Sequence, residues 1–254
     1  MFIYISKDNK NASKLALPFF TNLVKKKEKP VICFATGSSP IDLYNLIIED
    51  HKNNNTCWAN VVSFNLDEYV GADGSEEYSY RYFMNHHLFD HININIKNTH
   101  VPNGIGNINQ NILDYEKKIH DHNQIDLLLL GLGRNGHIGF CEPGTDISSL
   151  THVVKLHESS RKDHARMFFD NDISKVPTKA ITMGIKSIMN AKCIILLAFG
   201  ESKEDALKKL TQDHISLDCP ASILQLHPNV HIFVDEQAAK SINKDNLYLQ
   251  IFNL

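Results

Sequence analysis

The stretch IDLLLLGLGRNGHIGFCEPGTD, residues 125–146, joins an unbroken hydrophobic run to a glycine-rich turn that carries a histidine. Four consecutive leucines before a glycine are typical of a strand that is covered on both faces, as strands of parallel sheets are. Similar short runs alternate with longer amphipathic segments along the chain, which is the pattern of βαβ units. The sequence therefore predicts an α/β fold, a three-layer αβα sandwich with a mainly parallel central sheet.

The expected elements follow from this alternation. Strands are expected over residues 2–6, 31–36, 61–66, 125–133, 193–200 and 231–235. Helices are expected over about 8–28, 40–52, 79–90, 107–122, 178–190, 201–212 and 235–243, and Pro18 should kink or split the first of them. The charged segment 155–177 lacks strand alternation and is expected to form a mobile lid. Because no long linker interrupts the chain, we expect a single domain over residues 1–254.

Composition narrows the classes of function. Hydrophobic residues make up 43% of the chain and charged residues 22%, and the net charge of -3 gives no broad basic surface for nucleic acid. The five cysteines are odd in number and contain no CxxC pair, which indicates a reduced, cytoplasmic protein. The first residues lack a signal-peptide pattern and the apolar stretches have strand length, so no membrane span is expected.

Ligands of open parallel sheets bind beyond the carboxyl ends of the strands, so the residues that follow each strand are the first candidates. After the strand at 31–36 come Gly37, Ser38 and Ser39, and then Pro40 at a helix start. Glycine lets the backbone approach a ligand, and helix N–H groups with serine hydroxyls favour an anion such as phosphate. An ordinary βα turn with serine caps is the alternative. This stretch is neither GxGxxG nor a P-loop, which disfavours ATP and dinucleotides.

The strand at 61–66 is followed by two adjacent carboxylates, Asp67 and Glu68. Neighbouring residues of an extended backbone point to opposite sides, so one carboxylate is expected to face a cleft while the structure holds the other. The sequence thus offers one candidate base. A polar strand end that caps the next turn is the alternative reading of the same residues.

The turn after the strand at 125–133 places His137 at a strand end, and Glu142 follows five residues later. A carboxylate beside an imidazole orients the ring and stabilises its protonated form, an arrangement suited to proton transfer. Gly133 and Gly136 are expected to leave room for a ligand. A lone histidine after a strand is more often structural, but the two glycines and the carboxylate favour a functional role.

No metal site is expected. His86 and His87 lie on one expected helix and His120 and His122 on another, where side chains one or two positions apart do not share a face. HExxH motifs and cysteine clusters are absent from the sequence, and His137 with one nearby carboxylate falls short of a catalytic zinc set.

Several motifs together resemble, in order, those of the glucosamine-6-phosphate deaminases, within the glucosamine/galactosamine-6-phosphate isomerase family. They are ATGSSP at 35–40, FNLDEYVG at 64–71, GLGRNGHIGFCEPGT at 131–145, THVV at 151–154, KAITMGI at 179–185, LLAFGESK at 196–203 and PASILQLHPNV at 220–230. The resemblance covers nearly the whole chain and implies a Rossmann-like fold. Related 6-phosphogluconolactonases share the shorter GxGxxGHxxxxxP theme, whereas NLDEYVG with GFCEPG indicates the deaminase branch.

The resemblance implies a role for each residue of the catalytic group. Asp67 would be the base that moves the C2 proton of the sugar, and His137 would catalyse opening of the pyranose ring. Asn135 and Glu142 would hold and tune the histidine. Asparagine stands at 135 where many members have aspartate, and it can orient the ring without carrying negative charge. Cys141 replaces the usual asparagine before the glutamate, a change that we interpret as tolerated packing.

The resemblance also implies a phosphate site that holds the substrate away from its reacting carbons. Its residues would be Gly37, Ser38, Ser39, Arg166 and Lys203. From the sequence alone, Arg166 and Lys203 could equally be rim charges, since exposed Lys and Arg are the norm. Met167 is an extra residue, relative to the family pattern, between Arg166 and the Phe-Phe pair at 168–169. The alignment of Arg166 with the family's arginine therefore stays open.

The expected reaction is conversion of glucosamine 6-phosphate and water to fructose 6-phosphate and ammonia, without metal or cofactor. The expected partner is therefore a small amino-sugar phosphate and neither nucleic acid nor membrane. His152 and Val154 stand where regulated hexameric members carry basic residues, so we expect no activation by N-acetylglucosamine 6-phosphate. Monomer or homo-oligomer stays open. The alternatives are a 6-phosphogluconolactonase-type hydrolase and a sugar-phosphate sensor that binds without reacting.

Overall fold

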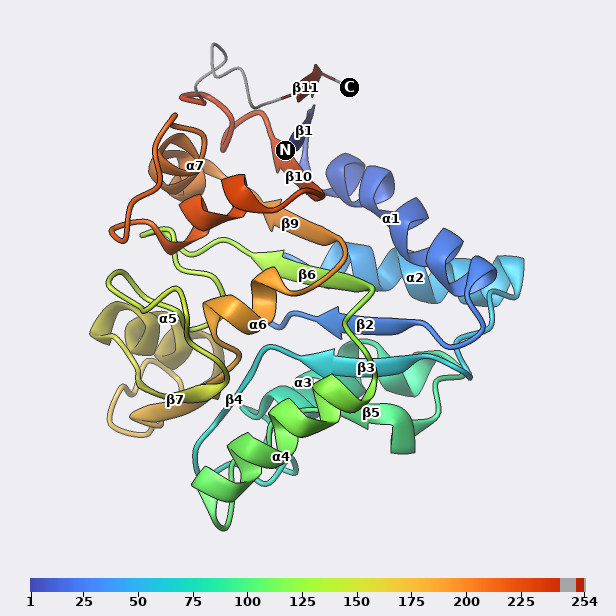
Figure 1. The fold of residues 1–254 in the computed structure, drawn as a ribbon, viewed down its shortest axis with the longest axis vertical. Helices are drawn as coiled ribbons and strands as arrows, with labels where there is room; N and C mark the ends of the chain where they lie inside the picture. Colours follow the sequence, from blue (N-terminus) through green and yellow to red (C-terminus); the bar gives the residue numbers. More distant parts are fainter. Residues whose placement is uncertain (243–249, 254) are drawn as a thin grey trace.

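An eight-stranded sheet runs through the centre of the computed structural model, which describes residues 1–242 and 250–253 (Figure 1). The strand order is β11-β1-β10-β9-β6-β2-β3-β5, and the paired neighbours are parallel. The strands are β1 (Phe2–Ser6), β2 (Val31–Phe34), β3 (Val62–Asn65), β5 (Thr99–His100), β6 (Leu127–Gly131), β9 (Ile194–Ala198), β10 (Val230–Asp235) and β11 (Gln250–Asn253). The parallel α/β sheet is thus confirmed, and each of the predicted strands forms.

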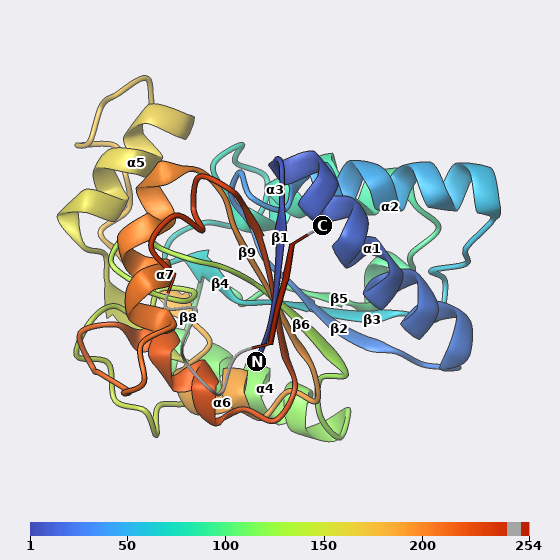
Figure 2. The same ribbon diagram turned by 90° about the horizontal axis from the view of Figure 1, so that it is seen from above.

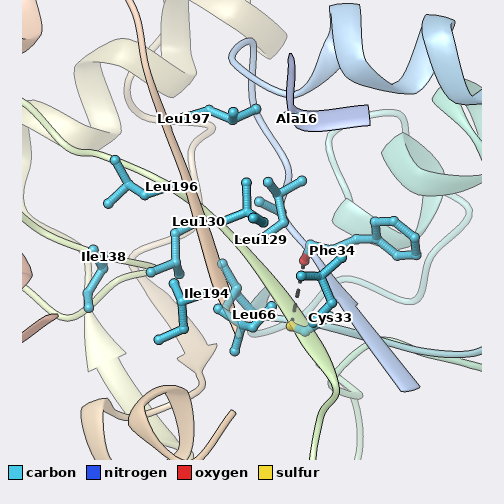
Figure 3. Packing of buried hydrophobic residues seen from close by; sticks show 14 of the residues in the cluster. Ala16, Cys33, Phe34, Leu66, Leu129, Leu130, Ile138, Ile194, Leu196 and Leu197 are labelled. Atoms are coloured by element: carbon cyan, nitrogen blue, oxygen red, sulfur yellow. Dashed lines mark hydrogen bonds between the residues drawn. The ribbon is translucent and has the colours of Figure 1, made fainter. Parts of the chain in front are cut away.

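The central strands are covered on both faces, as their unbroken hydrophobic runs predict. Leu129 and Leu130 of β6 and Ile194 and Leu196 of β9 have no exposed surface, and they pack with Phe34 of β2 in one cluster (Figure 3). Burying a side chain of this size contributes about 1.5–3 kcal/mol. The sheet centre is therefore rigid, and it fixes the positions of the loops that leave it.

Helices form the outer layers. One face of the sheet carries α1 (Asn9–Lys26), α2 (Ile41–Asn54) and α3 (Tyr80–His87), and the other carries α4 (Ile108–Asp121), α6 (Ile185–Met189) and α7 (Glu204–Leu210) (Figure 2). Short 3-10 turns cover Phe89–His91, Ile96–Asn98, Glu201–Lys203 and Pro220–Leu226. The first helix continues through Pro18 as one element, so the expected split does not occur.

No helix in the described part of the chain is both long enough and apolar enough to cross a membrane.

A second, antiparallel sheet lies beyond the carboxyl ends of the central strands. It has the order β4-β8-β7, from β4 (Asp67–Tyr69), β8 (Lys179–Thr182) and β7 (His152–Lys155). The helix predicted over 178–190 is therefore wrong in its first half. Ala180, Ile181 and Thr182 are fully buried between two partner strands, and this pairing overrides a local pattern that also fits a helix.

The helix predicted over 235–243 is also wrong where the structure describes it, because turns follow β10 over 236–241; residue 243 lies outside the described residues. The Asp235 carboxylate accepts hydrogen bonds from the backbone N–H groups of Gly200 and Ala238, at 2.9 Å for Gly200 to Oδ2 and 2.8 Å for Ala238 to Oδ1. Such a side-chain acceptor stabilises a turn in competition with a helix.

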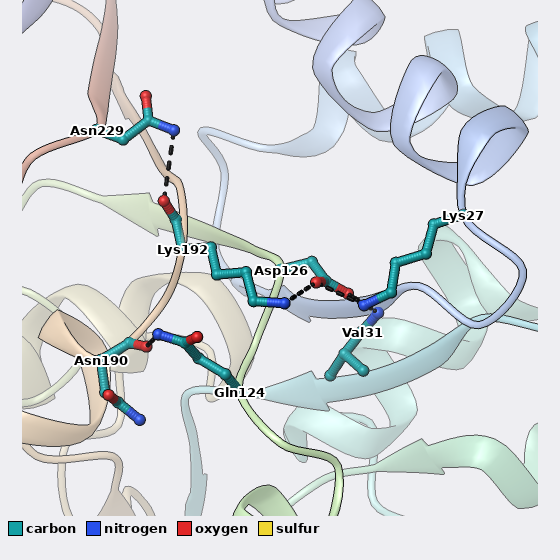
Figure 4. A network of polar contacts seen from close by, with 7 residues as sticks. All are labelled: Lys27, Val31, Gln124, Asp126, Asn190, Lys192 and Asn229. Carbon is teal, nitrogen blue, oxygen red and sulfur yellow. Dashed lines mark hydrogen bonds and ion pairs between the residues drawn. The ribbon is translucent and has the colours of Figure 1, made fainter.

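The amino ends of the central strands are held together by Asp126, which lies just before β6 and is 6% exposed at its side chain. Its carboxylate accepts hydrogen bonds from Lys27 Nζ at 2.6 Å, Lys192 Nζ at 2.8 Å and the Val31 backbone N–H at 2.8 Å (Figure 4). These partners precede or begin β2 and β9. The charges at this end of the sheet therefore serve stability, whereas the candidate residues lie at the opposite end.

Candidate active site

The carboxyl ends of four neighbouring strands carry most of the predicted residues. In the order β9-β6-β2-β3, Lys203 follows β9, His137 follows β6, the Gly37–Ser39 loop follows β2 and Asp67 follows β3. Figure 1 shows β4, β7 and α5 (Glu158–Phe168) on this same side of the sheet. Parallel pairing thus brings together residues that lie far apart in the sequence.

A hydrogen-bonded relay forms in the loop after β6. His137 Nδ1 lies 2.7 Å from Asn135 Oδ1, and Asn135 Nδ2 donates to Glu142 Oε2 at 2.6 Å. Because the carboxylate fixes the amide with its NH₂ toward Glu142, the amide oxygen is the acceptor and His137 Nδ1 carries the hydrogen. The lone pair of the neutral ring then lies on Nε2, where it can take up or return a proton.

The surroundings of Glu142 favour its ionised form. Burial alone would raise the pKa of its carboxyl group, but hydrogen bonds from His137, Asn135 and Ser160 lower that pKa to about 2. Its Oε1 atom lies 3.5 Å from His137 Nδ1 and accepts the Ser160 hydroxyl at 3.0 Å. A permanent negative charge next to the imidazole stabilises the protonated ring.

The two glycines of this loop make room for protein side chains rather than for a ligand, contrary to the sequence-based expectation. A Cβ atom at Gly133 would lie 2.3 Å from Cε1 and Nδ1 of His137, so the imidazole rests against bare backbone. At Gly136, where φ is +85°, a Cβ atom would lie 2.4 Å from Cys219 Sγ. Gly133 therefore sets the position of the histidine ring.

The adjacent carboxylates after β3 have different surroundings. Glu68 accepts backbone N–H groups from Tyr69 at 2.8 Å, Tyr80 at 3.0 Å and Arg81 at 2.9 Å, and so it caps the start of α3. Burial raises the pKa of Glu68 to about 7, while these three donors act in the opposite direction. Glu68 is held by the structure, which leaves Asp67 as the candidate base.

Asp67 is 6% exposed, and burial followed by the nearby Glu68 raises its pKa well above the usual value of an aspartate. It pairs with Thr182 across β4 and β8, and the Thr182 hydroxyl oxygen accepts the Phe140 N–H at 3.0 Å. A Cβ atom at Gly139 would lie 3.7 Å from Asp67 Oδ2. The chain that leaves His137 thus passes close to Asp67 at Gly139.

The loop after β2 leads into an uncapped helix start. Gly37 has a φ of +94° with open space around it, and Pro40 occupies the N-cap position of α2 without a side-chain capping hydrogen bond. The start of α2 therefore has no serine side-chain cap. The first-turn N–H groups of α2 and the residues Ser38 and Ser39 follow β2, which is the neighbour of β6, the strand before the His137 relay.

The two predicted cations differ in their placement. Lys203 is partly exposed in the turn after β9, whose first residue, Gly200, has a φ of +82° and is fixed by Asp235. Arg166 is exposed on the last turn of α5, outside the set of strand-end loops. The structure therefore places Lys203 in a strand-end turn and Arg166 on α5.

Two contacts of the site were not expected from the sequence. Ser160 lies in a charged segment with no periodic signal, and Thr182 lies in a segment whose pattern predicts a helix. Cys141 is buried and its thiol donates to the Met183 carbonyl at 3.4 Å, which fits the interpretation of tolerated packing. Across the described ranges, the structure places no three His, Cys, Asp or Glu side chains so that they could hold a metal ion.

The family model for glucosamine-6-phosphate isomerases/6-phosphogluconolactonase matches residues 10–232. The chain belongs to this family. Among its relatives, the glucosamine-6-phosphate deaminase of Oceanobacillus iheyensis is 47% identical and aligns over 96% of this chain and 97% of its own length. That of Clostridium perfringens strain 13 is 44% identical, over 94% of this chain and 99% of its own length.

Solved structures of the glucosamine-6-phosphate isomerase/6-phosphogluconolactonase family place the chain on the same fold. A monomeric glucosamine-6-phosphate deaminase has a TM-score of 0.91 at 38% identity, covering 94% of this chain and 99% of that one. The 6-phosphogluconolactonase of Thermotoga maritima has a TM-score of 0.73 at 18% identity, covering 93% and 100%, and this likeness shows the fold alone. The Rossmann-like fold is confirmed.

Proposed function

We propose that the chain converts glucosamine 6-phosphate and water to fructose 6-phosphate and ammonia. The observation that carries the proposal is that a buried carboxylate, Asp67, and a histidine relay lie at the same strand-end edge of the sheet in a family member. The relatives at 42–47% identity that are named glucosamine-6-phosphate deaminases support the same reaction. The substrate is accordingly an amino-sugar phosphate, and the expected place of action is the cytoplasm.

Ring opening is the first step, because the C2 proton becomes acidic only beside a free carbonyl group at C1. His137 takes the proton of the anomeric hydroxyl on Nε2 and delivers a proton to the ring oxygen. The Nδ1–H bond to Asn135 keeps the ring in the required tautomer, and ionised Glu142 stabilises the imidazolium between the two transfers.

Isomerisation and loss of ammonia follow. Asp67 removes the C2 proton while the C1 oxygen takes up a proton, which gives an enolamine. The proton on Asp67 then returns at C1, the amino group loses a proton, and the resulting imine at C2 adds water and releases ammonia. A raised pKa suits this task, since a carboxylate that holds its proton more tightly is a stronger base toward a C–H bond. One sugar phosphate and one water are consumed, and fructose 6-phosphate and ammonia are formed, so the atoms balance.

The phosphate group is assigned to Gly37, Ser38 and Ser39, with Lys203 beside them and Arg166 delivered by segment 155–177 acting as a mobile lid. Binding energy from this unreactive group positions C1 and C2 against the catalytic side chains. Closure of the lid over a single sugar-phosphate domain would add the Arg166 charge and exclude water.

The decisive assay compares substrates side by side on purified protein. Ammonia release and fructose 6-phosphate formation from glucosamine 6-phosphate, with no hydrolysis of 6-phosphogluconolactone, are expected. The reverse pattern would favour the lactonase, and binding without turnover of either would favour the sensor. N-acetylglucosamine 6-phosphate is included as a third arm, in which we expect no activation.

The role of Asp67 has its own test. Asp67→Asn keeps the shape of the side chain but removes the proton acceptor, so substrate affinity should persist while kcat falls by about 10³-fold or more. Calorimetric titration with glucosamine 6-phosphate and steady-state assays measure the two effects separately. Full turnover by this variant would exclude Asp67 as the base.

A further inference from the structure

One contact joins α5 to the histidine relay. Ser160, 7% exposed on α5, donates its hydroxyl to Glu142 Oε1 at 3.0 Å. The same oxygen lies 3.5 Å from His137 Nδ1, while the other carboxylate oxygen accepts the Asn135 amide at 2.6 Å. Each oxygen of Glu142 therefore has a donor of its own, one from the relay loop and one from α5.

The helix that carries Ser160 is tied to the chain that returns from it. Arg161 Nη2 donates to the carbonyls of Ile173 at 2.7 Å and Val176 at 3.1 Å. Ala165, Phe169 and Val176 form a small hydrophobic cluster with Ile173. We call residues 158–176 the α5 unit, since these contacts hold the helix and its return segment together. Ser160 connects this unit to the catalytic loop.

We propose that Ser160 is a positioning residue whose hydroxyl orients the Glu142 carboxylate, so that the relay is complete only when the α5 unit is seated. Hydrogen bonds to ionised groups are strong and directional, so two donors fix the carboxylate plane more tightly than one. Without Ser160 the Glu142 carboxylate keeps the Asn135 donor at 2.6 Å but loses its donor on Oε1, and its terminal torsion has a broad energy minimum. The carboxylate plane is then less tightly fixed, and the Asn135 amide and the His137 ring are oriented less precisely.

The consequence is a link between substrate capture and proton transfer, and it rests on the proposed function. Seating of the α5 unit delivers both Arg166 toward the phosphate and Ser160 to Glu142. The ring-opening histidine is thus oriented for catalysis when the site is covered. A purely structural serine would help to seat the unit and change affinity, whereas a positioning serine changes turnover.

Four variants separate these roles. Ser160→Ala should lower kcat about tenfold, equivalent to about 1.4 kcal/mol, with KM changed less than about twofold. Ser160→Thr, which keeps the hydroxyl, should recover most of the loss. Arg161→Gln, which loosens the α5 unit without touching Glu142, should act mainly on KM. Ser174→Ala removes a hydroxyl that donates to Asp172 in the same unit and should match the wild type.

Unchanged kcat in Ser160→Ala would overturn the proposal, and so would a loss carried by KM alone. A second measurement does not depend on turnover. The Asn135 side-chain amide resonances in ¹⁵N-labelled protein should shift in Ser160→Ala, return toward the wild-type positions in Ser160→Thr and stay unchanged in Ser174→Ala. Wild-type protein that releases no ammonia would refute the proposed function, and the amide resonances would still decide for or against the positioning role.

Discussion

A single methyl group at Gly133 should disable the histidine relay while leaving the fold intact. In Gly133→Ala the new Cβ would lie 2.3 Å from Cε1 and Nδ1 of His137 and 2.4 Å from Cδ2, whereas ordinary contacts begin at 3.4 Å. The ring must therefore move by more than about 1 Å, which disturbs its 2.7 Å hydrogen bond with Asn135 Oδ1. A misplacement of this size costs about 10²-fold in rate, or about 2.7 kcal/mol in activation free energy.

Steady-state ammonia release from glucosamine 6-phosphate measures the loss, and thermal unfolding checks the fold. The melting temperature should change by only a few degrees, on the order of 1 kcal/mol, since the His137 side chain is 25% exposed and can swing outward. Gly131→Ala is the matched control, because a Cβ there meets nothing within 4 Å. Wild-type kcat in Gly133→Ala, or an equal loss in both variants, would refute the argument.

Three further outcomes are expected. His137→Gln should slow turnover of the cyclic substrate more than that of a pre-opened acyclic analogue, and equal defects with the two substrates would assign His137 another role. Ionised Glu142, whose pKa is lowered from 4.5 to about 2, should contribute roughly 2–3 kcal/mol of stability that is present above about pH 4.5 and lost as the pH falls toward 2. Urea unfolding of Glu142→Gln should lack that pH dependence, and an unchanged dependence would contradict the assignment. Asp126→Asn should lower the free energy of unfolding by about 2 kcal/mol, because two half-exposed ammonium groups lose their anionic partner. Asp121→Asn, which breaks an exposed helix pair, should leave the free energy of unfolding nearly unchanged in the same measurement, and equal losses would argue against the Asp126 contribution.

The central sheet could be predicted because strands that are buried on both faces appear in the sequence as unbroken hydrophobic runs. It missed β5, whose two residues, Thr99 and His100, are too few to form a pattern. The second sheet was missed for another reason. The segment KAIT at 179–182 becomes a strand through pairing with β4 and β7, which lie more than a hundred and about thirty residues earlier, and no local signal carries that information.

The candidate site was predicted to the extent that it follows from strand ends. Parallel topology places the residues after β2, β3, β6 and β9 at one edge, so the chemistry-bearing loops could be chosen from the sequence. Strand alternation alone could not choose between Asp67 and Glu68, and Asp67 was named only through the family resemblance. The structural reason lies on another element, because Glu68 accepts the backbone N–H groups of Tyr80 and Arg81. Ser160 was missed for the same reason, since its partner is Glu142, eighteen positions away.

The pKa values of the two carboxylates are shifted in opposite directions, because their surroundings offer different hydrogen-bond donors. Burial acts on both side chains in the same direction, toward a higher pKa. At Asp67, burial and the nearby Glu68 together raise the pKa, whereas at Glu142 three hydrogen-bonding side chains outweigh burial and lower it to about 2. In the proposed mechanism Asp67 must accept a proton from carbon, and Glu142 must leave the proton on the imidazole. With the two environments exchanged, the stronger base would compete for the imidazolium proton and the weaker one would face the C–H bond, so both steps of the proposed mechanism would be slower.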